Sequence, residues 1–365
     1  MMEKKNEQRK VLVGLSGGVD SAVTLALLRK NGYCVEAAFL SLQDNQGRAD
    51  KSLLDAGKIC EVLNVPLHII DARLKFKKTV IEYFLDEYSK GRTPNPCIFC
   101  NEQLKFKLLL KTAQKLKINL ISTGHYAQIK KQEVGDEKQG ENKKIYYQLL
   151  EAKDEKKDQS YFLYRLKQKQ LEKILLPLGA YTKKEVRELA GEFNLPVFDK
   201  QESQDVCFIS NNNLENFLAK QIKLKKGKII DTDGNVVGEH KSLALYTPGQ
   251  RKGINIGGVG PYFVVGKNLK KNILIVTNNQ KHPLLFQTKI NLKQVSWTSD
   301  CPELPLAVLA RIRYHKSLER ATIKLAENKK KYILEFEKSQ RAVSKGQSAV
   351  FYGKNGEVLG GGIIN

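Results

Sequence analysis

One glycine-rich segment of the chain has residue types that suit phosphate binding. An apolar run leads into Gly14-Leu15-Ser16-Gly17-Gly18-Val19-Asp20-Ser21, and a helical pattern follows. Gly17 and Gly18 permit a tight turn in which backbone N–H groups can approach an anion, while Ser16 and Ser21 add hydroxyl donors. The positive end of the following helix points to the same place. Phosphate is therefore the expected ligand.

This segment differs from the two most common nucleotide-binding motifs. A P-loop requires Lys followed by Ser or Thr after its glycines, and a dinucleotide fingerprint requires Gly-x-Gly-x-x-Gly. The segment resembles instead the PP-loop, Ser-Gly-Gly-x-Asp-Ser, of ATP pyrophosphatases. That resemblance implies ATP, with its β- and γ-phosphates in the loop and cleavage between the α- and β-phosphates. It also implies magnesium bound with ATP, which Asp20 would help to hold. A plain strand-to-helix turn is the alternative.

Two polar segments carry cysteines that are expected to be exposed and reactive. Residues 91–101 contain Cys97 and Cys100, and residues 203–209 contain Cys207. Cys100 is expected at the start of the next predicted helix, where the helix dipole lowers the pKa of a thiol. The remaining cysteines are expected to take no part in chemistry: Cys34, Cys60 and Cys301.

Several further motifs occur in one order and give the chain a family resemblance. They are Thr93-Pro94-Asn95-Pro96, Cys100-Asn101, Thr123-Gly124-His125-Tyr126, Lys157-Asp158-Gln159-Ser160, Cys207-Phe208-Ile209, Gly249-Gln250-Arg251-Lys252-Gly253 and Gly346-Gln347-Ser348. With the PP-loop, they make nearly the whole chain resemble the tRNA-specific 2-thiouridylases of the PP-loop ATP pyrophosphatase superfamily.

The resemblance implies an ATP-dependent sulfurtransferase that acts on tRNA. A uracil carbonyl is a poor electrophile, and adenylation of O2 of the wobble uridine turns that oxygen into a leaving group. Persulfide sulfur then replaces it to give 2-thiouridine, with AMP and pyrophosphate released. The resemblance assigns Cys100 as nucleophile and Cys207 as persulfide carrier. Cys207 could deliver the sulfur directly, or Cys100 could attack the persulfide, release hydrosulfide and leave a Cys100–Cys207 disulfide.

The resemblance also implies binding residues and partners. The ATP pocket would comprise Gly14, Leu15, Ser16, Gly17, Gly18, Val19, Asp20, Ser21, Leu40 and Gly124. The target base would face Asn95, Pro96 and Cys97, and tRNA would contact His125, Lys157, Asp158, Gln159, Arg313, Tyr314 and Gln347. A cysteine desulfurase or a sulfur-relay protein would donate the sulfur. The protein is expected to be a monomer.

Cys97 departs from the family pattern, in which many members have Asp as a candidate proton-transfer group. The resulting Cys97-x-x-Cys100 could join Cys207 in ligating an iron–sulfur cluster, which is an alternative mechanism. Two alternative functions remain open. One is a different PP-loop ligase that acts on a small molecule, and the other is a basic RNA-binding module without catalysis.

Composition supports a large polyanionic partner. The 365 residues include 62 Lys and Arg against 39 Asp and Glu, a formal net charge of +23. Such a charge favours nucleic acid, although lysine decoration of the surface would produce the same figure. No apolar run approaches the roughly 18 residues of a membrane helix, and no signal peptide is evident. We therefore expect a cytoplasmic protein that makes no membrane contact and keeps its thiols reduced.

The hydrophobic pattern predicts an α/β chain of three domains, which position the loop, the cysteines and the expected binding residues. In the first, a Rossmann-like parallel sheet has strands at 10–15, 34–42, 67–71 and 120–123, with helices at 21–30, 51–63, 76–88, 102–116 and 183–193. Two prolines predict a non-helical loop over 91–97, and a hairpin follows with its connection at 130–144. The second half predicts short strands, including a hairpin at Asp233-Gly234. The expected domains are 1–205 for catalysis, 206–285 for a central β-rich unit and 286–365 for a barrel-like, tRNA-contacting unit.

Overall fold

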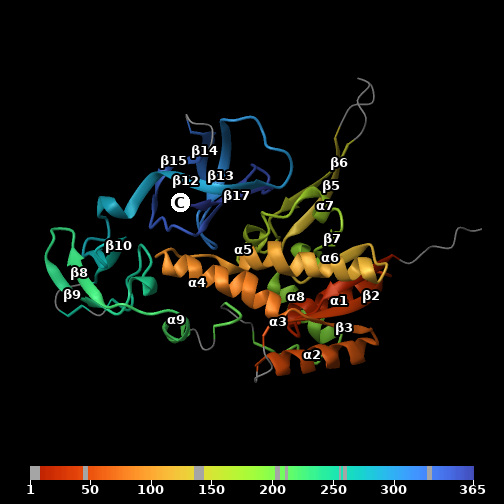
Figure 1. Cartoon of the computed structure of the whole chain (residues 1–365). Helices are drawn as coiled ribbons and strands as arrows, with labels where there is room; N and C mark the ends of the chain where they lie inside the picture. The colour runs from red at the N-terminus through yellow and green to blue at the C-terminus, as the bar shows by residue number, and fades with distance from the viewer. Residues whose placement is uncertain are drawn as a thin grey trace, which may run out of the picture.

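The computed structural model describes residues 9–43, 48–134, 144–201, 206–209, 213–254, 256–257, 261–326 and 331–365. Figure 1 shows three parts of the structure. The N-terminal half of the chain forms a sheet covered by helices, a small sheet lies to one side, and a barrel lies above the helices. The predicted class, a parallel α/β sheet followed by two β-rich units, is confirmed. Parts of the predicted connection at 130–144 and of the predicted boundary near 201–209 lie outside the described residues.

The first sheet is wholly parallel and has the order β3-β2-β1-β4-β7. Its strands are β1 (Lys10–Gly14), β2 (Cys34–Ser41), β3 (Leu67–Asp71), β4 (Leu120–Thr123) and β7 (Ile174–Leu175). The chain moves outward from β1 to β3 and then returns to the other side of β1 as β4. Strand order thus reverses beside β1, and in such sheets ligands bind outside the carboxyl ends of the strands at this point.

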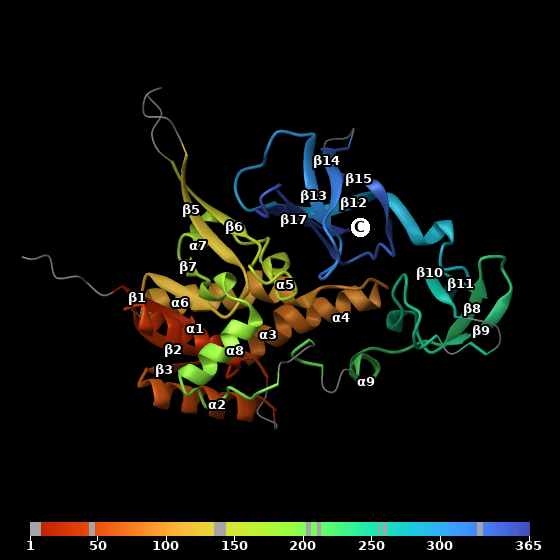
Figure 2. The ribbon, with the colours of Figure 1, turned by 180° about the vertical axis from the view of Figure 1, so that it is seen from behind.

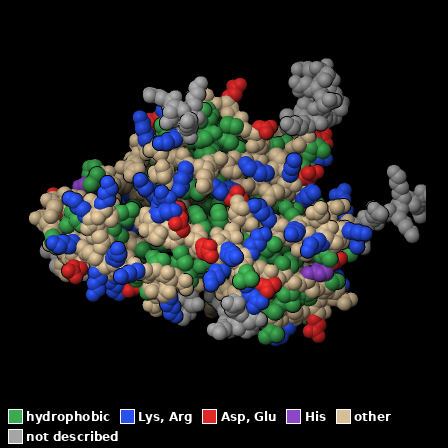
Figure 3. All heavy atoms as spheres, viewed as in Figure 1, with side chains coloured by type: hydrophobic (Ala, Val, Ile, Leu, Met, Phe, Trp, Pro, Cys, Tyr) green, Lys and Arg blue, Asp and Glu red, His purple; other side chains and the backbone are tan. Residues whose placement is uncertain are grey.

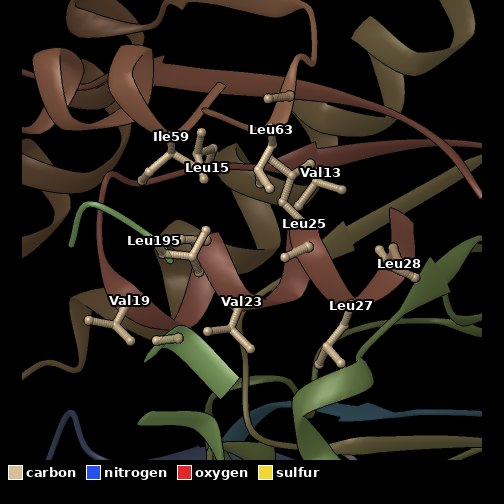
Figure 4. Packing of buried hydrophobic residues seen from close by; sticks show 14 of the residues in the cluster. Val13, Leu15, Val19, Val23, Leu25, Leu27, Leu28, Ile59, Leu63 and Leu195 are labelled. Carbon is tan, nitrogen blue, oxygen red and sulfur yellow. The ribbon is translucent and has the colours of Figure 1, made fainter. Parts of the chain in front are cut away.

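Alternating side chains of β1 pack on opposite faces of the sheet. Val11 and Val13 belong to a core formed with α1 (Val19–Lys30), α2 (Arg48–Leu63) and α8 (Lys183–Glu192), part of which Figure 4 shows. Leu12 points the other way and packs with Phe106 and Leu109 of α6 (Phe106–Lys115). All three β1 side chains are fully buried. This two-sided burial explains why the strand is an uninterrupted apolar run.

A second helical layer leads from the sheet toward the other two units, as the view from behind also shows (Figure 2). It consists of α3 (Arg73–Phe76), a π-helical turn (Lys77–Ile81), α4 (Glu82–Ser89), α5 (Pro96–Cys100) and a second π-helical turn (Asn101–Lys105) that runs into α6. The other helices of the described residues are α7 (Gln168–Leu171), α9 (Leu214–Gln221) and the 3-10 turns Ser160–Phe162, Pro177–Ala180, Leu243–Leu245 and Pro283–Leu285. No helix in the described ranges combines the length and the hydrophobicity that crossing a membrane requires.

The prediction that residues 91–97 contain no helix is wrong at the end of that segment. Pro96 occupies the first position of α5, where a helix needs no backbone N–H. Asn95 caps the helix, because its side-chain oxygen accepts hydrogen bonds from the backbone N–H groups of Cys97 at 3.2 Å and Ile98 at 3.4 Å. The helical path therefore begins six residues before the predicted start at 102.

Three β-structures complete the chain. The predicted hairpin is β5 (Gln128–Val134) with β6 (Lys144–Leu150). The side sheet has the order β10-β11-β8-β9, from β8 (Gly227–Asp231), β9 (Val236–His240), β10 (Phe263–Asn268) and β11 (Ile273–Thr277). The closed barrel has the order β12-β15-β14-β13-β16-β17, from β12 (Phe286–Trp297), β13 (Leu306–Arg311), β14 (Glu319–Leu325), β15 (Tyr332–Arg341), β16 (Ser348–Tyr352) and β17 (Val358–Ile364).

Candidate active site

The glycine-rich loop joins the carboxyl end of β1 to the start of α1. Gly17 has a φ of +71°, and a Cβ atom there would lie 2.2 Å from the backbone oxygen of Ser52 in α2, so only glycine fits. The Ser21 hydroxyl accepts a hydrogen bond from the Ser16 N–H at 3.1 Å and donates to the Gly18 carbonyl at 3.0 Å. These internal bonds hold the loop in the turn that the sequence motif predicted.

The carboxyl end of β4 closes one side of this loop. A Cβ atom at Gly124 would lie 2.9 Å from both the carbonyl carbon of Asp20 and the nitrogen of Ser21, so glycine lets the two backbones touch. On the opposite side, the Leu15 N–H donates to the Ala38 carbonyl at 2.9 Å. Leu40 lies farther along the same strand, β2, and is half-buried. The expected ATP-binding residues are thus gathered around the switch point of the sheet.

Two lysines at the loop were missed by the sequence reasoning. Lys183 opens α8 and pairs through its Nζ with Asp20 Oδ1 at 2.6 Å, while the Tyr126 hydroxyl donates to the same oxygen at 2.8 Å. Lys200 donates to the Gly17 carbonyl at 2.7 Å and pairs with Asp55 at 2.5 Å. The loop is therefore bracketed by two cations. No local sequence motif predicts these contacts, because both lysines lie more than 150 residues after the loop in the sequence.

Cys100 is buried, contrary to the expectation of an exposed thiol at a helix start. It is the last residue of α5, lies inside the continuous helical path and is 4% exposed. Burial raises the pKa of its thiol to about 12, and charge on Cys207 or Cys97 would raise it further. The predicted lowering of the pKa by a helix dipole is therefore wrong. Cys97 and Cys207 are both exposed, as expected.

Aromatic packing brings the two distant cysteine segments together. The ring of Phe208, next to Cys207, lies edge-on to Phe76 at 5.7 Å and to Phe84 at 5.1 Å between centroids. Phe208 also packs against the small core that contains Cys100 and Phe76. In addition, the Gln43 side chain donates to the Cys207 carbonyl at 2.9 Å. The three cysteines 97, 100 and 207 are therefore electrostatic neighbours, as the effects of their charges on one another indicate.

Lys105 places a positive charge near Cys97, Cys100 and Cys207, which we call the thiol cluster. This lysine was not identified from the sequence. It ends the π-helical turn after Cys100, and its charge lowers the pKa of Cys97 and Cys100 against the effect of burial. It makes no hydrogen bond or ion pair with any residue that the structure describes. Its positive charge therefore favours the thiolate form of both cysteines.

His125 connects the thiol cluster to the glycine-rich loop. Its ring lies 5.8 Å from that of Phe106, the residue after Lys105, and its Nδ1 is 2.8 Å from the Thr123 hydroxyl oxygen. Burial, together with the charge of Lys105, lowers the pKa of His125 to about 3, so the imidazole is neutral near pH 7. The preceding residue, Gly124, contacts the glycine-rich loop. The expected phosphate site and the thiols therefore lie close to each other, on either side of His125.

Several expected tRNA contacts are engaged inside the protein. Asp158 is 2% exposed, and its carboxylate accepts hydrogen bonds from the N–H groups of Ala152 and Ser160 and from the Ser160 hydroxyl. It shapes its loop and presents no charge to a ligand, so direct contact through its carboxylate does not fit. The neighbouring Gln159 accepts a hydrogen bond from the Tyr126 N–H at 3.0 Å. Lys157, beside them, is half-buried.

The expected contacts on the barrel lie at its junction with the thiol segment. Arg313 donates to the carbonyls of Pro248 at 3.1 Å and Ala342 at 2.7 Å, and Tyr314 packs on the Phe162 ring at 4.5 Å. The Gln347 side chain donates to the carbonyl of Thr93 at 2.9 Å, and the Thr93 N–H donates to the Lys345 carbonyl at 2.8 Å. A barrel turn thereby holds the residues just before α5.

The surface and the thiol geometry bear on the remaining expectations. Figure 3 shows Lys and Arg side chains spread over the sheet domain, the side sheet and the barrel on one face. A distributed positive surface suits a large polyanion better than a small one. Within the described ranges, no three His, Cys, Asp or Glu side chains are arranged to hold a metal ion.

Comparisons with known proteins cover nearly the whole chain. Three family models match in succession: "tRNA methyl transferase HUP domain" at residues 9–211, "tRNA methyl transferase PRC-barrel domain" at 215–278 and "Aminomethyltransferase beta-barrel domain" at 287–364. The tRNA-specific 2-thiouridylase MnmA of Hydrogenovibrio crunogenus is 41% identical over 374 residues, covering 99% of this chain and 95% of that protein. The protein of the same name from Clostridium perfringens is 39% identical over 369 residues, covering 98% of each chain.

Proposed function

This chain belongs to the tRNA-specific 2-thiouridylase family, and we propose that it uses ATP to replace O2 of the wobble uridine of tRNA with sulfur. The observation that carries the proposal is the adjacency of two chemically different half-sites. One is the anion-binding loop at β1, and the other is the group of three thiols around Lys105. His125 and Gly124 lie between them. A ligase acting on a small molecule would need the loop but has no use for the thiols.

The first half-site suits the activation step. ATP bound with its β- and γ-phosphates at the Gly14–Ser21 loop would meet backbone N–H groups, the Ser16 hydroxyl and the positive end of α1. Uridine O2 attacks the α-phosphorus, the bond to the β-phosphate oxygen breaks, and pyrophosphate leaves. Lys183 and Lys200 stand where they can offset the charge of that leaving group. Magnesium carried by ATP would share Asp20 with Lys183, and would supply further charge compensation.

The second half-site suits the transfer of sulfur. A cysteine desulfurase or a sulfur-relay protein loads the exposed Cys207 with a persulfide. Cys100, as thiolate, attacks the Cys207 sulfur of that persulfide, so that a Cys100–Cys207 disulfide forms and hydrosulfide leaves. Hydrosulfide then adds to C2 of the activated uridine and expels AMP. Direct attack by the terminal persulfide sulfur is the other route, and it also ends in a Cys100–Cys207 disulfide once Cys100 releases the product.

Burial of Cys100 gives Lys105 a role in this chemistry. A thiol with a pKa of about 12 is almost wholly protonated near pH 7, so its attack requires stabilisation of the thiolate. The charge of Lys105 acts on all three cysteines and is unbalanced by any described carboxylate. We assign Lys105 as the residue that stabilises each thiolate as it forms.

The barrel and the positively charged surface supply the proposed place for tRNA. Asn95, Pro96 and Cys97 stand beside the thiols, and the barrel turn at Gln347 holds the segment that presents them. Lys157, His125 and Tyr314 are retained as proposed tRNA contacts, whereas Asp158, Gln159 and Arg313 are proposed to position loops. The division at 205/206 and 285/286, the cytoplasmic location and the monomeric state are likewise proposals.

The test combines ATP, magnesium, a cysteine desulfurase and unmodified tRNA, with nucleosides analysed by mass spectrometry. We expect 2-thiouridine from the native protein and from Cys301→Ser, a control that removes an exposed cysteine of the barrel. Cys100→Ser and Cys207→Ser should each abolish the product. Undiminished product from either variant would refute the two-cysteine mechanism. A methylated nucleoside in place of a thiolated one would refute the function itself.

A further inference from the structure

Cys97 is a third thiol for which the two-cysteine reaction has no task. It occupies the second position of α5, directly after Pro96, and Cys100 occupies the fifth. Helix geometry places the Cα atoms of such a pair about 5 Å apart. That separation lies within the range of roughly 4.4–6.8 Å that a disulfide spans. The Cα spacing in the first turn of α5 is thus compatible with a Cys97–Cys100 disulfide.

The two thiols of this turn differ in their access to solvent. Cys97 is exposed, whereas Cys100 is 4% exposed. This is the arrangement of redox Cys-x-x-Cys motifs at helix N-termini, in which one sulfur meets external partners and the other stays shielded. Cys207 lies within electrostatic range of both, because its charge would raise the pKa of each, and the neighbouring Phe208 packs on the core that contains Cys100.

The proposed reaction leaves the enzyme blocked after one turnover. It ends with Cys207 tied to Cys100, and Cys207 must be free before it can accept another persulfide. An external reductant can reach only the Cys207 side of this disulfide, because Cys207 is exposed and Cys100 is buried. Cys97, one helical turn away, reaches the Cys100 sulfur without any diffusion step, and such intramolecular reactions have effective concentrations far above those of a cellular reductant.

We propose that Cys97 is the resolving thiol of this site, a role that rests on the proposed function. The Cys97 thiolate attacks the Cys100 sulfur, the Cys100–Cys207 bond breaks, and Cys207 leaves as a thiolate that takes a proton from solvent. A Cys97–Cys100 disulfide results, and the number of electrons held by the three cysteines is unchanged. An external dithiol then attacks the exposed Cys97 sulfur, is itself oxidised to a disulfide, and returns both cysteines to thiols.

Lys105 serves this exchange as it serves the sulfur transfer. Its ammonium group acts electrostatically on all three thiols, so it stabilises the attacking and the leaving thiolate in turn. The π-helical turn Asn101–Lys105 separates Lys105 from Cys100. Its wider turn directs the Lys105 side chain differently from an α-helix of the same length. The site therefore resembles a redox centre attached to a nucleotide-binding sheet.

The experiment maps the disulfide that remains after one turnover. Protein loaded with persulfide and mixed with ATP, magnesium and tRNA, without reductant, is quenched in acid, alkylated and digested. Per molecule of 2-thiouridine formed, we expect one Cys97–Cys100 disulfide in the native protein and one Cys100–Cys207 disulfide in Cys97→Ser and in Cys97→Asp. With dithiothreitol as dithiol, the ratio of the steady-state rate to the first-turnover rate should fall by about tenfold or more in both variants.

Two outcomes would overturn the proposal. One is a Cys100–Cys207 disulfide as the main species in native protein that has made 2-thiouridine. The other is stoichiometric iron and sulfide in anaerobically purified, active protein, which would assign the three thiols to a cluster. Failure of the proposed function is recognised separately, because the native protein then makes no 2-thiouridine even in the first turnover. Cys301→Ser, with a cysteine removed on the barrel, should match the native disulfide pattern.

Discussion

Replacement of Gly17 by alanine tests the packing that shapes the glycine-rich loop. Gly17 has a φ of +71°, and an added Cβ atom would lie 2.2 Å from the Ser52 carbonyl oxygen and 3.1 Å from the Ser52 carbonyl carbon. Those atoms are backbone atoms of α2, so no side-chain rotation relieves the clash. Either the loop or the helix must move, and both belong to the main sheet domain.

The expected cost follows from two contributions. A left-handed backbone conformation costs a residue with a Cβ atom about 1–2 kcal/mol. Overpacking against a backbone that can shift only in part costs about 1–3 kcal/mol. The free energy of unfolding should therefore fall by about 2–5 kcal/mol, which corresponds to a decrease of about 4–20 °C in the Tm of a domain of this size.

Gly18→Ala is the matched control, one residue along the same loop. Gly18 has a φ of −106°, and the nearest atom to its added Cβ would be the Ser16 Oγ at 3.5 Å, an ordinary contact. Thermal unfolding of the full chain without ATP should show a Tm within about 2 °C of native for this variant. A Cβ beside the Ser16 hydroxyl should nevertheless weaken ATP binding, which isothermal titration with a non-hydrolysable ATP analogue measures.

The comparison refutes the reasoning if the two variants unfold at the same temperature. That result would mean that α2 does not press on the loop as the structure describes. Retained stability together with lost ATP binding in Gly17→Ala would have the same meaning. A low Tm for Gly18→Ala would show that the loop is packed on a side where the structure leaves space.

Three further perturbations test other parts of the structure. Arg311→Met removes the guanidinium partner of the buried Asp158 and the partly buried Glu151, and should lower the free energy of unfolding by about 3–5 kcal/mol. Lys324→Met breaks an exposed ion pair and should change the free energy of unfolding by less than about 1 kcal/mol; equal Tm values for the two variants would contradict this. Lys105→Met should slow 2-thiouridine formation, because it removes the charge that lowers the pKa of Cys97 and Cys100, whereas Lys105→Arg keeps that charge and should stay near the native rate. Equal initial rates for the Met variant and the native protein would oppose the assigned role. Because burial raises the pKa of Cys100 to about 12, its thiolate fraction and its alkylation rate should rise about tenfold per pH unit from pH 7 to 10, as peptide mass mapping measures, and a plateau below pH 9 would be inconsistent with burial.

Local patterns of sequence predicted most elements of the sheet domain. The strands at 67–71 and 120–123 match β3 and β4 residue for residue, because apolar and β-branched runs between turn residues leave few alternatives. The hairpin at Asp233-Gly234 is confirmed for the same reason, since Gly234 supplies a φ of +96°. The residue preferences of such turns depend on a few adjacent residues, so they can be recognised in the sequence without knowledge of tertiary contacts.

The missed elements depend on neighbours that are distant in sequence. The strand β17 contains Gly360, Gly361 and Gly362, a run that usually indicates a turn. A Cβ atom at Gly360 would lie 2.4 Å from the Ser296 carbonyl oxygen, and one at Gly361 would lie 2.8 Å from the Tyr164 ring. Glycine at these positions allows Ser296 and Tyr164 to pack closely against β17, and these contacts exist only in the folded barrel. The helix α9 was likewise not predicted.

The sequence by itself determined the loop that suits phosphate, the cysteines that could react, the family, and the succession of strands and helices along the first domain. These are short-range properties, because a turn, an alternation or a motif is set by adjacent residues. Only the tertiary structure decided the burial of Cys100, the approach of Cys207 through Phe208, and the presence of Lys105, Lys183 and Lys200 beside them. Burial and electrostatic fields are sums over atoms from remote segments, and those sums exist only once the chain has folded.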